Sequence, residues 1–206
     1  MPLTREQLQS LNVGINEATL LGVEFDPERR IAAATLAVLS LPETGPMADD
    51  PRVQFLFRPV GRIVASLREG HWDDPTAELV KFEVTDLLAV VQSFGGLAIY
   101  GWEFFDVDDS TSYDRWAKRV SLDYSSGTDG LTHTVELFQS AEHRTLDLRL
   151  WFDELMVRTA AGEVISWEEF AAGGKRWWDG LYTGDERTKN SGISPLNSGG
   201  GLPPLA

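Results

Sequence analysis

Apolar and polar residues alternate most regularly over residues 145–152. Every second position there is leucine or phenylalanine, and the positions between them include Asp147, Arg149 and Trp151. Because neighbouring side chains of a strand point to opposite faces, this pattern predicts a strand with one buried face and one largely solvated face. Gly162 follows at a distance that suits a hairpin, since glycine can adopt the positive φ that a tight turn requires.

The next segment carries the signals of a helix start. Ser166 precedes Glu169 by three residues, the spacing of a capping box, in which the serine hydroxyl accepts a backbone N–H and the glutamate side chain accepts the serine N–H. We therefore predict a helix from Trp167 onward. Gly173 and Gly174 fall inside it, and because glycine lowers helix propensity by about 1 kcal/mol per residue, we expect this pair to split or kink the helix.

Strand patterns recur through the rest of the chain. They are separated by residues that favour turns, and they cover residues 21–25, 31–41, 53–57, 63–67, 79–84, 97–105, 120–124 and 132–138. Gly61 interrupts this series, so residues 53–68 form either a second hairpin or one long bent strand. The segment 97–105 is the most aromatic, and we expect it to be a central strand.

Capping residues predict two further helices, and together these elements define a fold class. The Thr4 cap begins a short peripheral helix, and the Thr85 cap begins an apolar helix that ends at Gly95. We predict an α+β fold: a predominantly antiparallel sheet of about eight to ten strands, curled or two-layered, with two main helices packed against it. Residues 1–182 form the single domain, and residues 183–206 form a flexible tail rich in Gly, Ser and Pro.

Composition narrows the class of protein. The chain has 206 residues, of which 42% are hydrophobic, enough for a sizeable core. It contains no cysteine, which excludes disulfides, zinc sites built on thiolates, iron–sulfur clusters and cysteine nucleophiles. No secretory pattern opens the chain, and no apolar run is long enough to span a bilayer. We therefore expect a soluble, cytoplasmic protein with no membrane partner.

Charge and missing motifs exclude further classes. The formal net charge is −14, and the acidic residues are spread along the whole chain. Because nonspecific binding to phosphate backbones depends on clustered Lys and Arg, nucleic acid is not an expected partner. The chain lacks the glycine-rich nucleotide loops GxGxxG and GxxxxGK[ST] and the GxSxG elbow of hydrolases, and we predict no cofactor.

One acidic cluster suggests a metal site, but its sequence does not match the full pattern of a calcium-binding loop. Asp106, Asp108 and Asp109 are similar to the opening of an oxygen-lined calcium loop. Thr111 stands where such a loop needs glycine, and Ala117 stands where it needs a bidentate glutamate. The histidines also lack the spacing of a zinc motif. We therefore predict no metal site and name these three aspartates as the candidates to test.

Candidates for catalysis rest on acidic residues beside aromatic ones. Glu103 has aromatic neighbours in sequence, and Asp153 and Glu154 follow Trp151 closely, so Glu103 with Asp153 or Glu154 could supply the acid and the base or nucleophile of a glycosidase cleft. His71 precedes two aspartates and is the histidine with the most reactive surroundings. Glu103, Asp153 and His71 are therefore the catalytic candidates.

The tryptophans indicate a binding surface. The chain has seven, more than a core of this size needs, and Trp is enriched at interfaces. Trp151 falls on the polar face of its strand, close to two acids, and the adjacent Trp177 and Trp178 cannot face the same way on a helix. The predicted binding residues are Trp151, Asp153, Glu154, Trp177 and Trp178.

Three functions follow from these patterns. We favour a non-enzymatic protein-binding module, for example an acidic inhibitor or immunity-type protein that covers a basic partner with carboxylates around Trp or Tyr anchors. The first alternative is a small hydrolase or ligand-binding barrel with a carboxylate-lined pocket. The second is a structural subunit of a homo-oligomer.

Overall fold

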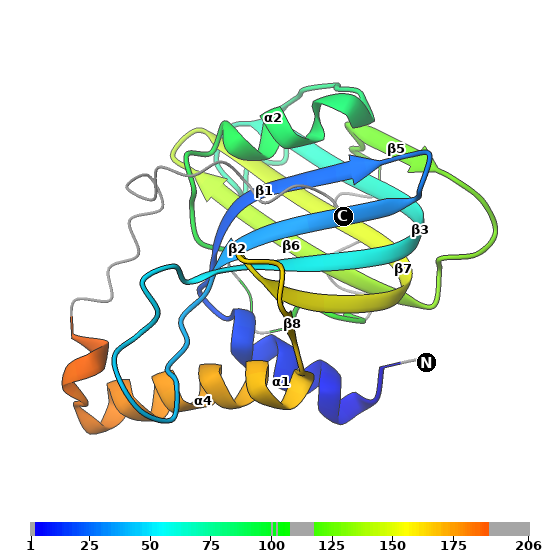
Figure 1. The fold of residues 1–206 in the computed structure, drawn as a ribbon. Coiled ribbons are helices and arrows are strands. Elements are labelled where there is room, and N and C mark those ends of the chain that lie inside the picture. The colour runs from blue at the N-terminus through cyan, green and yellow to red at the C-terminus, as the bar shows by residue number, and fades with distance from the viewer. Residues whose placement is uncertain (1–2, 100, 102, 108–117, 190–206) are drawn as a thin grey trace.

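In the residues that the structure describes, the protein is an antiparallel sheet of eight strands, strongly curled, with three α-helices around it (Figure 1). The computed structural model describes residues 3–99, 101, 103–107 and 118–189. The predicted α+β class is confirmed. The strands are β1 (Thr19–Asp26), β2 (Ile31–Ala37), β3 (Arg52–Glu69), β4 (Glu78–Leu79), β5 (Leu122–Ser125), β6 (His133–Ala141), β7 (Arg144–Thr159) and β8 (Val164–Ile165). The helices are α1 (Arg5–Ile15), α2 (Leu87–Gln92) and α4 (Trp167–Thr183), with short 3-10 turns η1 (Val84–Asp86) and η2 (Glu186–Thr188).

Two long strands form the middle of the sheet. The main strand order is β1-β2-β3-β7-β6, and β3 pairs with β7 along nearly its whole length. A register shift between Val60 and Arg62 bends the pair, and β3 changes its other neighbour there from β2 to β5. Residues 53–68 are therefore one long bent strand, and the hairpin alternative is wrong. This bend lets one sheet curl around a single core.

The core lies on the concave face of the sheet. The four apolar side chains of the 145–152 pattern are at most 1% exposed, as are Phe55 and Phe57 of β3. Helix α2 covers this core from the β1 side through Leu87 and Val91. Because burying one large apolar side chain stabilises a fold by about 1.5–3 kcal/mol, this alternating pattern contributes strongly to folding. The hairpin predicted at Gly162 is present as the β7–β8 pair.

The predicted central strand at 97–105 is not a regular strand in the part of the segment that the structure describes. Ala98 forms an isolated bridge with Thr19 at the β1 edge, and Phe105 forms one with Val135 at the β6 edge. The segment therefore meets both outer edges of the curled sheet. The prediction was wrong because large apolar residues can be buried without pairing to strands on both sides. Ile99, Phe104 and Phe105 are buried in this way. Tyr100 and Trp102 lie outside the described residues.

A second prediction was wrong in length. Residues 79–84 were expected to be a strand, yet only Glu78 and Leu79 pair with β3 before the chain turns into η1. The helix predicted from Thr85 is shorter than expected, with α2 spanning only Leu87–Gln92. Its C-terminal Gly95 has a φ of 70°, as the predicted helix ending requires.

Helices α1 and α4 lie side by side below the sheet, on the side away from α2 (Figure 1). The peripheral helix predicted at Thr4 is in fact packed into the core, with Leu11 and Ile15 each 1% exposed. A Cβ added to Gly174 would lie 2.8 Å from the Cα of Gly14, closer than real Cβ atoms approach. Glycine at position 174 therefore allows the two helix backbones to touch, and the missing Cβ at Gly14 leaves room for the ring of Phe170.

The predicted break at Gly173 and Gly174 is absent, because α4 runs through both residues. Gly173 faces the chain at Ser40, and its carbonyl accepts the N–H of Leu41 at 3.0 Å. Close packing thus outweighs the low helix propensity of glycine. Ser166 caps the helix as predicted, accepting the Glu169 N–H at 3.2 Å. The reverse half of the capping box is not seen, since Glu169 pairs with Arg176 at 2.9 Å.

The chain continues past α4 in contact with the body. Arg187 donates to the carbonyls of Pro42 and Gly45, both at 3.3 Å, and Thr188 is buried. The rest of the predicted tail, residues 190–206, lies outside the described residues. Among the described helices, none has the length and apolar character needed to cross a membrane.

Candidate binding pocket between helices α1 and α4

A surface pocket of about 490 Å³ lies where α1, α4 and the segment around Glu103 meet. Its volume falls within the range of about 300–1,000 Å³ that is typical of small-ligand sites. The side chains around it are mostly polar, acidic or aromatic, with Val13 as the one aliphatic side chain among the lining residues described. They are Gln9, Asn12, Val13, Asn16, Glu17, Glu103, Trp178 and Tyr182.

Helical periodicity places the residues of two walls. Gln9, Asn12, Val13 and Asn16 are spaced three or four apart, so they share one face of α1 and its C-terminal end. Trp178 and Tyr182 are four apart on α4, and their ring centroids lie 6.3 Å from each other with planes 32° apart. Because Gly14 and Gly174 bring the two helices into contact, these faces meet at one pocket.

Asn12 fixes the third wall. Its side-chain oxygen accepts the backbone N–H of Phe104 at 3.0 Å and that of Phe105 at 3.4 Å. This contact holds the neighbouring Glu103 beside α1. Glu17 follows the C-cap of α1 with a φ of 58°, a left-handed conformation that turns the chain away from the helix.

The pocket is negatively charged. Glu17 and Glu103 are both exposed, and no lysine or arginine lines the pocket among the residues that the structure describes. The nearby α4 cations have other partners: Lys175 pairs with Asp179, and Arg176 binds Glu169 and the Leu41 carbonyl. A positively charged group would therefore meet carboxylates here without first displacing an internal cation.

The two helices of the pocket also carry exposed apolar side chains. Val13 is 44% exposed, Leu181 43% and Tyr182 80%, and all three belong to α1 or α4. They are half of the six large hydrophobic side chains that are exposed in the described part of the chain. Apolar groups gathered at one place on a surface, beside polar ones, are typical of interaction sites.

The structure brings together residues that the sequence had assigned to different functions. Glu103, a catalytic candidate, and Trp178, a binding candidate, line the same pocket. Trp177 faces elsewhere, as predicted: it is 5% exposed and packs with Leu39 and Leu41. The α1 residues and Tyr182 were missed, although their helical spacing was visible in the sequence.

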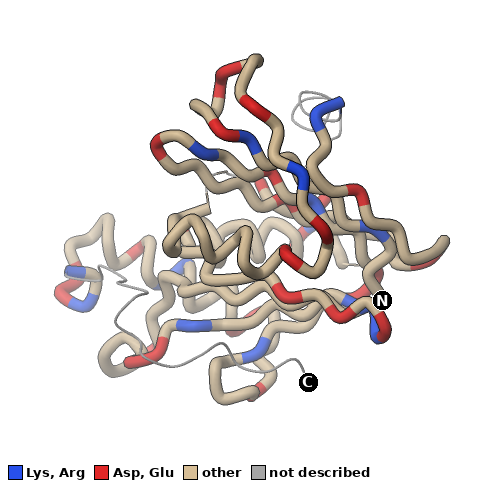
Figure 2. The backbone as a smooth tube through the Cα atoms, turned by 90° about the horizontal axis from the view of Figure 1, so that it is seen from above, with Lys and Arg blue, Asp and Glu red and all other residues tan. Residues whose placement is uncertain are grey.

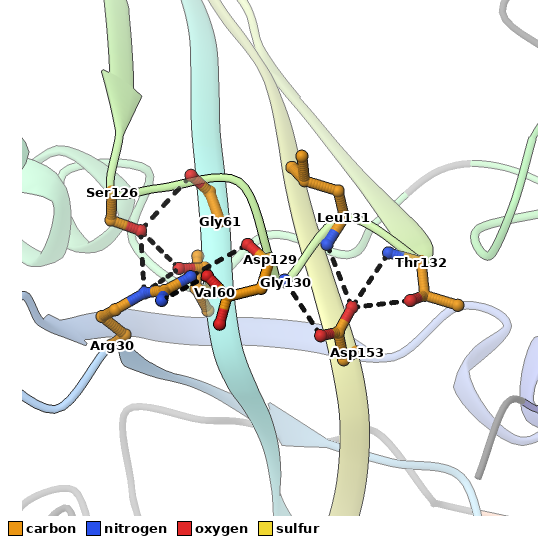
Figure 3. Close-up of polar contacts among 9 residues, drawn as sticks. All are labelled: Arg30, Val60, Gly61, Ser126, Asp129, Gly130, Leu131, Thr132 and Asp153. Atoms are coloured by element: carbon orange, nitrogen blue, oxygen red, sulfur yellow. Dashed lines mark hydrogen bonds and ion pairs between the residues drawn. The ribbon is translucent and has the colours of Figure 1, made fainter.

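Asp153 serves a different part of the molecule. Figure 3 shows its carboxylate pointing at the loop that precedes β6. It accepts the N–H groups of Gly130, Leu131 and Thr132 at 2.9, 3.0 and 3.1 Å, and the Thr132 hydroxyl at 2.6 Å. The hydrogen bond from the Thr132 hydroxyl is the main reason that the pKa of Asp153 lies below its ordinary value. Partial burial raises this pKa, and the backbone N–H groups lower it further. Asp153 thus anchors a loop and does not line the pocket that holds Glu103.

Arg30 fastens the same loop from the other side. Its guanidinium binds the Asp129 carboxylate at 2.7 Å and the Asp129 carbonyl at 2.9 Å, and it also contacts Ser126 (Figure 3). We name residues 126–132 the clamped loop. Its charged groups have partners within the fold.

The predicted binding residues on β7 are also engaged internally. Trp151 is half-buried, with the guanidinium carbons of Arg62 and Arg149 at 5.2 and 5.4 Å from its ring centroid. Arg62 pairs with Asp123 at 2.7 Å, and the fully buried Arg149 pairs with Glu136. Burial lowers the pKa of Arg149 to about 10. The exposed Glu154 pairs with Arg58 at 3.4 Å.

His71 and Asp106 do not line this pocket. His71 contacts Asp73 in an exposed loop, beside Trp72. Asp106 accepts from His133 Nδ1 at 2.8 Å and from the Thr134 N–H at 2.7 Å.

Asp108 and Asp109 lie outside the described residues. Within the described ranges, no three His, Asp or Glu side chains are grouped so that they could hold a metal ion.

Acidic residues occur all along the described backbone rather than in one block (Figure 2). No protein-family model matches the chain, and neither the curated proteins nor the solved structures contain a match to it. The chemistry of the residues that line the pocket favours a cationic group with flat or apolar surface.

Proposed function

We propose that this chain is a non-enzymatic binding protein that holds a basic protein partner through the pocket and the exposed α1–α4 surface. One observation carries the proposal: two carboxylates without a described partner line the same pocket as two aromatic side chains, and no described cation lines it. Trp and Tyr are the residues that most often anchor interfaces, and the net charge of −14 would accelerate association with a basic partner.

The rim supports a protein partner over a small metabolite. Val13 and Tyr182 line the pocket and remain 44% and 80% exposed, and Leu181, which precedes Tyr182 on α4, is 43% exposed. A protein surface could bury these side chains together with the pocket, giving an apolar centre with charged groups around it. An inhibitor or immunity-type role fits this arrangement, because such proteins act by covering a partner's surface.

A pull-down from the extract of the source cells, with bound proteins identified by mass spectrometry, tests the proposal. We expect a basic protein that is captured at low salt and lost at high salt. Capture should also be lost with Tyr182→Ala and with the double variant Glu17→Gln/Glu103→Gln. The matched controls are Trp72→Ala, which removes an exposed aromatic elsewhere, and Glu43→Gln/Glu163→Gln, which removes two exposed charges elsewhere.

Two results would contradict the proposal. The first is the absence of any salt-sensitive partner. The second is a partner that the control variants lose as readily as the pocket variants. Light scattering on the purified protein checks the homo-oligomer alternative, since a dimer broken by Tyr182→Ala would mean that this surface covers a second copy of the chain.

The hydrolase alternative has one observation in its favour. Glu17 and Glu103 line one pocket together with two aromatic rings, and a glycosidase needs two carboxylates beside a sugar-stacking surface. Hydrolysis of nitrophenyl glycosides by the wild type, abolished in Glu103→Gln, would support it. Asp153, the partner first predicted for Glu103, is occupied by the clamped loop.

A further inference from the structure

The fold already contains one tryptophan that is paired with arginine, at Trp151. Two guanidinium groups lie within 5.4 Å of its ring centroid. Each of these arginines also contacts a carboxylate, Arg62 that of Asp123 and Arg149 that of Glu136. An aromatic face, an acid and an arginine thus form one unit on the sheet, with two arginine–acid pairs around the single ring of Trp151.

The α1–α4 pocket has two parts of this unit. Trp178 and Tyr182 supply aromatic faces, and Glu17 and Glu103 supply carboxylates. The arginine is the part that no described residue provides. We propose that an arginine side chain of the basic partner enters this pocket; this inference rests on the function proposed above and names the group that is recognised.

The carboxylates of the pocket suit a group that only donates hydrogen bonds. Carboxylates accept without donating when ionised, and arginine presents five N–H donors and no acceptor. The side-chain amides of Gln9 and Asn16 also line the pocket, and each offers an oxygen acceptor as well as an NH2 donor. Phosphate or carboxylate ligands would be repelled by the two glutamates, because the lining holds no described cation.

The rings favour arginine over lysine. A guanidinium is planar and weakly hydrated, so it can lie flat on a Trp or Tyr face while its edge reaches a carboxylate. An ammonium is compact and strongly hydrated, and it gains less from a flat surface. Tyr182 is 80% exposed, so its ring is accessible to a side chain that arrives from solvent.

A peptide titration followed by NMR tests this inference directly. The probes are acetyl-Gly-Arg-Gly-amide, the same peptide with Lys or with Gln in place of Arg, and the neutral disaccharide cellobiose. The readouts are the indole N–H signal of Trp178, assigned by its loss in Trp178→Phe, and the side-chain amide signals of Gln9 and Asn16. We expect millimolar binding of the arginine peptide, several-fold weaker binding of the lysine peptide, and no shift with the glutamine peptide.

Variants locate the contact. Glu17→Gln/Glu103→Gln should weaken binding of the arginine peptide at least tenfold, whereas Glu43→Gln/Glu163→Gln should leave it unchanged. The melting temperature of each variant, compared with wild type, shows that the fold is retained. Trp178→Phe keeps an aromatic ring and should bind more weakly than wild type but better than Trp178→Leu.

The possible results separate this inference from the proposed function. If the pull-down partner depends on the pocket but the arginine peptide causes no shift at millimolar concentration, the arginine assignment is overturned and the binding function stands. Lysine binding equal to or tighter than arginine binding, or binding of cellobiose alone, also overturns it. If the peptide binds but no protein partner is captured, the pocket recognises arginine and the proposed partner is wrong.

Discussion

The outer face of the sheet and the α1–α4 pocket use similar residues for opposite purposes. Around Trp151 and Asp153, the acids and arginines contact one another or the backbone, and they hold strands and the clamped loop in place. In the pocket, Glu17 and Glu103 have no partner among the described residues, although two aromatic rings line the same pocket. Residue type alone therefore does not identify an acid that is available for binding. Whether the acid already has a partner within the fold is what distinguishes the two regions.

The largest expected effect is at Arg149. This side chain is fully buried and paired with Glu136, so Arg149→Met should lower the free energy of unfolding by about 3–5 kcal/mol, because it removes the counter-charge from a poorly solvated carboxylate. Urea denaturation measures the change. Arg58→Met, which breaks the exposed pair with Glu154, is the control and should cost about 0–1 kcal/mol. Equal losses in the two variants would show that burial of Arg149 is not what matters.

The helix contact that builds the pocket comes next. Gly174→Ala should destabilise the protein by about 1–3 kcal/mol, because the new methyl group would push α4 away from the backbone at Gly14. It should also weaken any ligand of the pocket, since the α1 and α4 walls separate. Gly162→Ala has open space around it and tests the cost of a positive φ alone. Thermal melting of both variants distinguishes packing from backbone strain.

The Asp153 anchor should be of intermediate importance, and it predicts a pH dependence. Asp153→Ala leaves three backbone N–H groups without their acceptor and should cost about 1–3 kcal/mol at pH 7. The pKa of this carboxyl is lowered in the folded state. Its stabilisation is therefore present above the unfolded value of about 3.9 and is lost as the pH falls through the folded value.

The stability difference between wild type and Asp153→Ala should accordingly shrink between neutral pH and pH 3, as measured by urea denaturation at each pH. Glu154→Ala provides the comparison, because Glu154 is exposed and contacts only Arg58 in the described structure. A difference that stays constant with pH would show that the ionised form of Asp153 is not responsible.

The smallest effect on stability is expected in the pocket itself. Glu17→Gln/Glu103→Gln should change the free energy of unfolding by no more than about 0.5 kcal/mol, because both side chains are exposed and have no described partner. A loss as large as that of Asp153→Ala would remove the distinction between the two regions. Binding, rather than folding, should report these substitutions.

Local signals predicted much of the fold. The leucine alternation at 145–152, the caps at Thr4 and Ser166 and the turn at Gly162 each depend on neighbouring residues, and each is present. The segment 97–105 was mispredicted because its described part, which includes the buried Phe104 and Phe105, forms single bridges to two distant strands, and no short pattern reveals such contacts. Tertiary contacts decided the structure there.

The pocket could be predicted only in pieces. Glu103 and Trp178 each had an unusual setting in sequence, but nothing local joins them. Their meeting depends on Asn12, which holds the chain at Phe104, and on the contact between Gly14 and Gly174. Gly173 and Gly174 were interpreted as helix breakers because a sequence does not show which other segments pack against a helix. The contact of Gly174 with Gly14 is seen only in the three-dimensional arrangement of α1 and α4.

The segment 97–105, which forms bridges to β1 and β6, also determines how another chain can approach the sheet. β1 and β6 are the outermost strands of the main sheet path, and backbone groups of Leu97 and Phe104 hydrogen-bond to them at Leu20 and Glu136. An open strand edge is a template for adding a strand from another molecule, whether a peptide or an aggregating copy. At these points the strand edges are already hydrogen-bonded to the protein's own backbone. A partner is thereby directed away from backbone pairing and toward the side chains of the two helices.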